Sequence, residues 1–249
     1  MCTLSFSPTT NGLLLAMNRD ESLQREIASA PRFFCSQEST AIYPSEASGG
    51  TWLAANDCGL VLALLNRNPS FARAKRRSRG EIIPELIHES SLSRAHARLL
   101  AMDHDGFLPF TLVALDASNQ RAIETRWDGA RLQTIGHPWA PRHWFSSSLS
   151  DEEATQVRGR TCEVFRRHFS LEPENLRQLH RSHSPAPGAF SLCVHREGVA
   201  TASYAEIRIH ATEASFAYAS GSPCERQPLM TLEFALQPSQ DAYTRASGY

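Results

Sequence analysis

The chain has 249 residues, of which 41% are hydrophobic and 20% are charged. Its 25 Lys and Arg residues nearly balance 26 Asp and Glu, which excludes the strong positive field of nucleic-acid coats and of polybasic membrane binders. The 13 Gly and 14 Pro residues are too few for a disordered or fibrous chain. We therefore predict an ordinary globular protein with no nucleic-acid partner.

The first residues carry neither the basic stretch nor the apolar run of a secretory signal. No window approaches the roughly 20 consecutive apolar residues of a membrane helix, so we expect no membrane insertion. Both observations favour a cytoplasmic protein, in which thiols stay reduced. The cysteines form no C-x-x-C pair and are interpreted as free thiols: Cys2, Cys35, Cys58, Cys162, Cys193 and Cys224.

The chain begins with the pattern of a β-hairpin. Residues 2–7 alternate apolar and polar side chains, and a continuous apolar run covers 13–17. Asn11-Gly12 stands between them and predicts a two-residue hairpin turn. Further strands are expected to open at 49–53 and to cover 60–65.

The rest of the chain alternates helical and strand patterns. A helix is predicted over 81–102, and a meander of three strands over 110–116, 121–127 and 131–135. Ser150 and Glu153 form a capping box that begins a second helix, and Pro173 begins a shorter one. Three more strands are expected, at 190–195, 200–210 and 215–219.

This order of elements predicts an α+β fold with antiparallel sheets. We expect a single domain over residues 1–236, followed by a polar C-terminal tail over 237–249. No motif in the sequence predicts an oligomeric state.

Cys2 is the sharpest candidate for chemistry. Removal of the initiator Met1, which is normal before a side chain as small as cysteine, would leave Cys2 with a free α-amine. An α-amine titrates near a pKa of about 8, where it can exchange a proton with a thiol of pKa about 8.5. An N-terminal nucleophile activated by its own amine is an established route to acyl transfer.

The hairpin places four consecutive polar residues, Asn18 to Glu21, beside Cys2. With Asn11-Gly12 as the turn, Cys2 lies opposite Glu21, and Arg19 is a diagonal neighbour on the same face. Asn18 and Asp20 then point to the other face, although a slip of one residue would exchange the two faces. The alternative interpretation is a solvated loop beside a buried cysteine.

Five motifs in this order resemble the NRDE family, which is also named for transport and Golgi organisation protein 2: Met1-Cys2, Asn18-Arg19-Asp20-Glu21, Gly49-Gly50-Thr51-Trp52-Leu53, a strand that ends in Asn66, and Ser78-Arg79-Gly80. The resemblance is dense over residues 1–80 and thinner from there to about Cys224. The family is similar in turn to N-terminal nucleophile hydrolases. The resemblance therefore implies a four-layer αββα sandwich and a cysteine amidohydrolase that acts on non-peptide C–N bonds.

The same resemblance implies roles for individual residues. Cys2 would be nucleophile and base, Arg19 and Asp20 would contact it, and Asn66 would donate to the oxyanion. Trp52 belongs to a family motif and is interpreted as a supporting side chain in the core.

The sequence departs from related acylases at two places. Bile-salt and penicillin V acylases carry Arg-x-x-Asp after the strand, and the gapless equivalents here are Asn18 and Glu21. Either Asp20 or Glu21 is then the acid that assists the amine. An asparagine of the eukaryotic members is replaced within residues 146–148, and Ser147 is its expected counterpart.

The alternative function is a binding or trafficking protein that keeps the pocket without the chemistry. The resemblance links animal members to haem handling and lipid metabolism, so haem or an acyl lipid is the alternative ligand. The catalytic interpretation instead needs only a small amide or acyl ligand and no cofactor.

Two histidine-containing spacings resemble metal ligands. His180 and His183 form H-x-x-H, and Cys193 lies two residues before His195, but neither spacing includes a third ligand. We therefore predict no metal site. The basic stretch over 73–79 is interpreted as a solvated loop or as a wall of the Cys2 pocket that favours anionic substrates.

Overall fold

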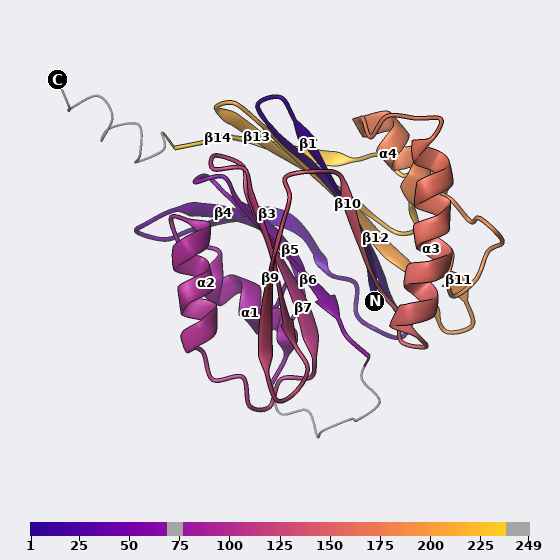
Figure 1. The fold of residues 1–249 in the computed structure, drawn as a ribbon, viewed down its shortest axis with the longest axis horizontal. Helices are drawn as coiled ribbons and strands as arrows, with labels where there is room; N and C mark the ends of the chain where they lie inside the picture. Colours follow the sequence, from indigo (N-terminus) through magenta and orange to yellow (C-terminus); the bar gives the residue numbers. More distant parts are fainter. Residues whose placement is uncertain (69–76, 238–249) are drawn as a thin grey trace.

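The fold is built on two antiparallel sheets of seven strands each, which lie face to face in the computed structural model (Figure 1). The structure describes residues 1–68 and 77–237. The first sheet, here called the Cys2 sheet, has the order β10 (Arg142–Ser146), β1 (Cys2–Thr9), β2 (Gly12–Ser22), β12 (Val199–His210), β13 (Glu213–Ser220) and β14 (Met230–Ala235), with β11 (His195–Arg196) paired to β12. The second, the Asn66 sheet, follows chain order: β3 (Ser29–Cys35), β4 (Thr40–Ser45), β5 (Leu53–Asn56), β6 (Leu60–Asn66), β7 (Phe110–Asp116), β8 (Arg121–Trp127) and β9 (Leu132–His137).

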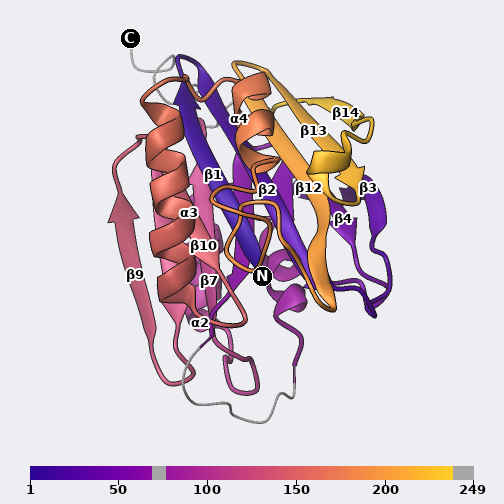
Figure 2. The same cartoon turned by 90° about the vertical axis from the view of Figure 1, so that its right-hand side faces the viewer.

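Helices cover the outer face of each sheet, which completes four layers in the order αββα. The helices α1 (Ile82–Leu86) and α2 (Leu92–Ala101) lie on the Asn66 sheet, preceded by the 3₁₀ turn η1 (Arg79–Glu81). The helices α3 (Asp151–Arg166) and α4 (Pro173–His180) lie across the Cys2 sheet (Figure 2), and a second 3₁₀ turn, η2 (Pro223–Glu225), lies near α4. The expected α+β sandwich with antiparallel sheets is confirmed.

The apolar run in β2 shows why a strand of this fold loses its alternating pattern. Leu13, Leu15 and Met17 face the core between the sheets, whereas Leu14 and Ala16 pack against the layer of α3 and α4. Both faces of the strand are therefore removed from water, and both carry apolar side chains.

The predicted hairpin is correct, but its register differs by two residues. Thr9 pairs with Gly12, so the turn residues are Thr10 and Asn11, and Cys2 lies opposite Arg19 rather than Glu21. Gly12 belongs to the strand because a Cβ there would collide with the carbonyl oxygen of Ile209 in β12. The glycine that was interpreted as a turn residue instead permits a close approach of two strands.

Other predicted elements need correction. The single helix over 81–102 is wrong, because the chain leaves the helix after α1 and the Asn56 side chain donates to the carbonyls of Ile87 and Glu89, at 2.7 and 3.0 Å. Ser91 then caps α2. The strand over 190–195 is reduced to β11, and four strands were not predicted: β3, β4, β10 and β14.

No helix in the described ranges is long and apolar enough to cross a membrane. Apart from Gln237, whose backbone N–H donates to the carbonyl of Asp57 at 2.6 Å, the expected tail lies outside the described residues. Arg73, Lys75 and Arg76 of the basic stretch lie outside them as well.

Candidate active site

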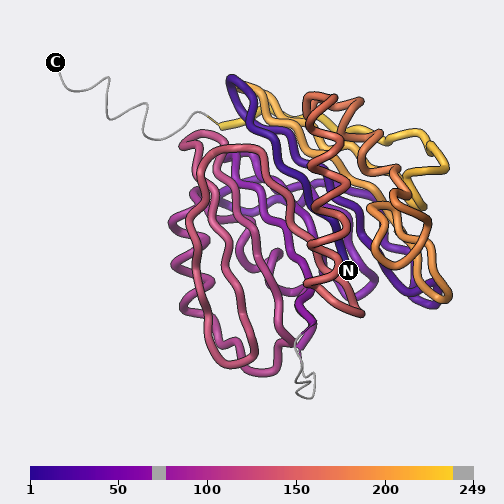
Figure 3. Tube along the Cα trace, turned by 45° about the vertical axis from the view of Figure 1, so that its right-hand side comes forward, coloured from indigo at the N-terminus to yellow at the C-terminus, as the bar shows by residue number. Residues whose placement is uncertain are grey.

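A polar pocket of about 80 Å³ opens beside the N-terminus of the chain. Figure 3 shows where this terminus lies in the fold. Cys2 and Arg19 reach it from the Cys2 sheet, and Asn66 reaches it from the end of β6 in the other sheet. The structure thus brings three of the four predicted catalytic side chains to one pocket. Trp52 and Glu21 also line it.

Two of the sequence motifs meet to form one wall of the pocket. The backbones of Gly50 and Gly80 approach so closely that a Cβ on either would lie 3.1 Å from the backbone of the other. The amide of Thr51 donates to the carbonyl of Gly80 at 3.0 Å. A side chain at either position would press the segment that carries Trp52 away from the segment that carries Arg79.

The Cys2 side chain is only 4% exposed. This burial raises the pKa of the Cys2 thiol above its ordinary value, and the nearby N-terminal ammonium group opposes the effect only in part. The backbone N–H of Cys2 donates to Ser146 Oγ at 2.9 Å, and the Met1 ammonium donates to the carbonyl of Asp20 at 3.0 Å. The thiol therefore stays protonated at neutral pH and needs a base to become a nucleophile.

Arg19 lies directly across the hairpin from Cys2 and is fixed by three groups. Its guanidinium carbon lies 4.3 Å from the centre of the Trp52 ring, a cation–π arrangement. The Nη2 atom donates to Glu21 at 3.1 Å and to Glu46 at 2.6 Å. Trp52 therefore supports a charged group of the pocket as well as the core. Glu46 was not predicted, because it lies in a loop 27 residues away in sequence.

Asn18 and Asp20 point to the opposite face of β2, as the alternation predicted. Asn18 donates to the carbonyls of His180 and Leu192, at 2.9 and 2.8 Å, and so holds the helical layer. Asp20 is fully buried and accepts from Thr201 Oγ1 at 2.7 Å.

The carboxylate of Asp20 reaches Cys2 only through another side chain. Its Oδ2 atom lies 3.3 Å from Nη2 of Arg158, and the side chains of both residues are fully buried. The Nη1 atom of Arg158 donates to the carbonyl of Cys2 at 3.3 Å and to Thr3 Oγ1 at 2.9 Å. The resemblance implied a contact between Asp20 and Cys2, and the structure places Arg158 between them. Arg158 was missed because an arginine in an amphipathic helix is normally exposed.

Ser147 does not line the pocket. It follows the end of β10, where its backbone N–H donates to Asp151 at 2.7 Å and its hydroxyl accepts from the N–H of Leu149. The neighbouring Ser146 lies opposite Cys2. The signal for this was present, because Ser146 has the same parity as Trp144, which packs in the core between the sheets.

The pocket carries an excess of positive charge. Four guanidinium groups line it against two carboxylates: Arg19, Arg25, Arg77 and Arg79 against Glu21 and Glu46. Burial lowers the pKa of the Arg79 guanidinium, and its Nη1 atom is held by the carbonyl of Pro109 at 3.0 Å. The described part of the basic stretch therefore forms a wall of the pocket.

The sequence profile of the family described as Transport and Golgi organisation 2 matches residues 1–184. The chain belongs to this family. No protein of curated function matches the sequence of this family member.

Solved structures that are similar to this chain share its fold at low sequence identity. The C2A mutant of conjugated bile acid hydrolase from Clostridium perfringens has a TM-score of 0.61 and 10% identity, with 96% of this chain and 97% of that chain covered. Penicillin V acylase from Agrobacterium tumefaciens has a TM-score of 0.56 and 9% identity, with 94% and 86% covered. The αββα arrangement is thus the fold of the N-terminal nucleophile hydrolases, as the resemblance implied.

Proposed function

We propose that this protein is an N-terminal cysteine amidohydrolase that cleaves non-peptide C–N bonds of small amides bearing an anionic group. The observation that carries the proposal is the position of Arg19, which two carboxylates and Trp52 hold directly across from the buried Cys2 thiol. A guanidinium fixed in this way beside a potential nucleophile is more than core packing requires.

The reaction begins after Met1 is removed and Cys2 has a free amine. The amine takes the thiol proton, and the sulfur attacks the amide carbonyl, so that a C–S bond forms and the negative charge moves to oxygen. Asn66 donates to this oxyanion. The ammonium then protonates the leaving nitrogen as the C–N bond breaks, which leaves a thioester.

Water completes the cycle. The amine takes a proton from water, which attacks the thioester, and the acid is released as the sulfur regains its proton. Because burial raises the pKa of the Cys2 thiol, the proton must pass through a nearby base, and the amine of the same residue is the nearest candidate. We assign the acids to positioning: Glu21 holds Arg19, and Asp20 holds Arg158, which in turn holds the carbonyl of Cys2.

A second candidate function is a binding protein that uses the same pocket with Met1 retained. The observation that favours it is the low exposure of the thiol, since an inert cysteine is normally buried. The cavity of about 80 Å³ then fits a small acyl group better than a ligand the size of haem.

Mass spectrometry and one pair of variants separate the two functions. We expect the intact protein to lack Met1, and limiting iodoacetamide to label Cys2 before Cys162 and Cys193, which are also buried but have no amine beside the thiol. Hydrolysis of a panel of N-acyl amino acids should disappear in Cys2→Ala and persist in the matched control Cys35→Ala, which changes an exposed cysteine in β3. A retained Met1, or an active Cys2→Ala protein with intact circular dichroism, overturns the catalytic proposal.

A further inference from the structure

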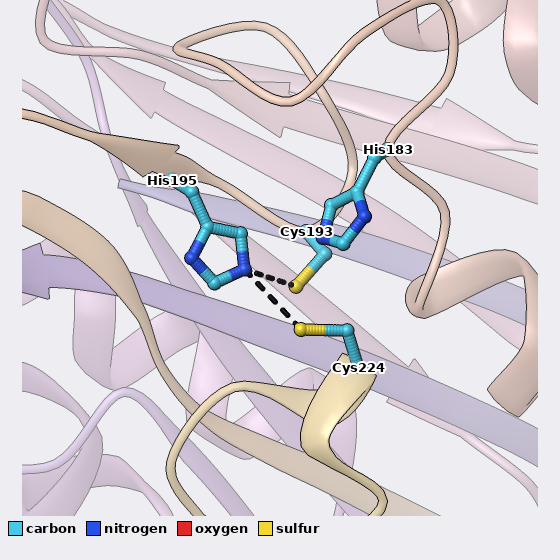
Figure 4. Close-up of side chains that lie close together, drawn as sticks. All are labelled: His183, Cys193, His195 and Cys224. Atoms are coloured by element: carbon cyan, nitrogen blue, oxygen red, sulfur yellow. Dashed lines mark hydrogen bonds between the residues drawn. The ribbon is translucent and has the colours of Figure 1, made fainter.

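Four potential metal ligands converge where the segment after α4, the strand β11 and the turn η2 meet, away from the pocket. They are His183 in the segment after α4, Cys193 just before β11, His195 in β11 and Cys224 in η2 (Figure 4). Their donor atoms all lie within 4.8 Å of one another. Neither histidine spacing showed this convergence in the sequence, because Cys224 is 29 residues from His195.

The distances fit a tetrahedral site. Zinc–sulfur bonds of about 2.3 Å and zinc–nitrogen bonds of about 2.0 Å give ligand separations of roughly 3.3 to 3.8 Å. His195 Nε2 lies 3.2 Å from the sulfur of Cys224 and 3.5 Å from that of Cys193. In Figure 4 both sulfur atoms point toward this nitrogen, and the His183 ring lies beside Cys193. A movement of less than about 1.5 Å by the farthest donor would complete the tetrahedron.

Burial gives a second, independent sign of a ligand. Cys193 is fully buried, and the other three residues are partly buried. The Nε2 atom of His183 is buried without a hydrogen-bond partner among the described residues. Burial of an imidazole nitrogen without a hydrogen-bond partner costs free energy, because nothing replaces its lost hydration. A bound ion would replace it.

We propose that His183, Cys193, His195 and Cys224 bind one Zn²⁺ ion. Two thiolates and two imidazoles form a donor set that selects zinc over the hard cations, which prefer oxygen. Because the protein supplies all four ligands, no position remains open for water or substrate, and the site is structural.

The zinc would fasten the segment between α4 and β11 to η2. The same segment is bound to the face of β2 that carries Asn18 and Asp20. The carbonyl of Leu192 accepts from the Asn18 side chain. The N–H of Val194 donates to Thr201, whose hydroxyl in turn donates to Asp20. Metal binding at this position would tie this segment to η2 in addition to these hydrogen bonds, and it would do so independently of the proposed hydrolysis.

The test uses the full chain purified under reducing conditions. Elemental analysis should find one zinc per chain in the wild type and in Cys58→Ser, which changes a partly buried cysteine outside the cluster, and little in Cys224→Ser. A chelator should lower the Tm of the wild type and of Cys58→Ser, and leave that of Cys224→Ser unchanged.

A second measurement keeps the proposal testable if Cys224→Ser does not fold. Wild-type protein stripped of metal and titrated with Co²⁺ should develop the visible absorption of tetrahedral, thiolate-bound cobalt, which one equivalent of Zn²⁺ then removes. Wild-type protein without zinc that also gives no cobalt absorption overturns the proposal. A Cys193–Cys224 disulfide in the unreduced, alkylated protein overturns it too.

Discussion

The buried pair of Asp20 and Arg158 offers the sharpest test of how the helical layer supports Cys2. Replacement of Asp20 by Asn keeps the size of the side chain and removes its charge, which leaves the guanidinium of Arg158 in a fully buried position without a counter-ion. Replacement of Arg158 by Met leaves the carboxylate with Thr201 as its remaining side-chain partner and removes the contacts to Cys2 and Thr3.

The expected magnitude follows from the complete burial of both side chains. Loss of one partner of a buried ion pair costs about 3–5 kcal/mol, because the other charge stays desolvated. With a urea m-value of about 3 kcal/mol per M, each single variant should lower the unfolding midpoint by roughly 1–1.7 M. The double variant Asp20→Asn/Arg158→Met removes both charges and should cost less than the sum of the single variants by about 2–3 kcal/mol.

Urea unfolding monitored by circular dichroism measures these differences. Arg160→Met is the matched control, because Arg160 is an exposed arginine in the same helix and its replacement should change stability by less than about 0.5 kcal/mol. Single variants that cost less than about 1 kcal/mol, or a double variant equal to the sum, would refute the interpretation of Arg158 as the link between Asp20 and Cys2.

Two further predictions concern pH and selectivity. Ser5 Oγ lies 2.8 Å from both the His143 and His180 rings, and burial lowers the pKa of His143 to about 4 and of His180 to about 3. As the pH falls below about 6.5, these histidines take up protons in the unfolded chain but not in the folded chain. The free energy of unfolding should therefore fall by up to about 1.4 kcal/mol per pH unit for each histidine between pH 6.5 and 4. Urea midpoints that do not change from pH 7 to 5 would contradict this. Arg79→Gln should lower kcat/KM for an anionic amide by roughly tenfold and leave a neutral amide unchanged, because a partly buried charge contributes about 1–2 kcal/mol to a counter-ion. Equal losses for both substrates would show that Arg79 only shapes the pocket, and the exposed Arg94→Gln is the control.

Local patterns predicted the elements whose signals lie within a few residues. The meander of β7 and β8 and the helix capped by Ser150 begin where the sequence indicated. The edge strand β14 was not predicted, although Met230, Leu232 and Phe234 alternate with Thr231 and Glu233 as in a half-buried strand. The break after α1 depends on Asn56, a residue of another strand, and no pattern within 81–102 could show it.

The residues of the candidate site also fall into those that a local pattern could place and those that only tertiary contacts bring in. Cys2 and Arg19 belong to one hairpin, so alternation along its two strands was enough to place them on one face. Glu46 and Arg158 reach this region through tertiary contacts that span 27 and 156 residues of sequence. The zinc ligands show the same limit, because Cys224 joins the other three only when η2 packs near α4.

The hairpin also shows that the pocket depends on parity rather than on register. A shift of two residues between β1 and β2 changes which side chain lies opposite Cys2, but it leaves Arg19 and Glu21 toward the pocket and Asn18 and Asp20 toward the helices. The four adjacent residues of this motif are therefore two interleaved pairs, of which one lines the pocket and the other holds the helical layer. An insertion of one residue in β2 before Asn18 would exchange those positions, whereas an insertion of two would preserve them.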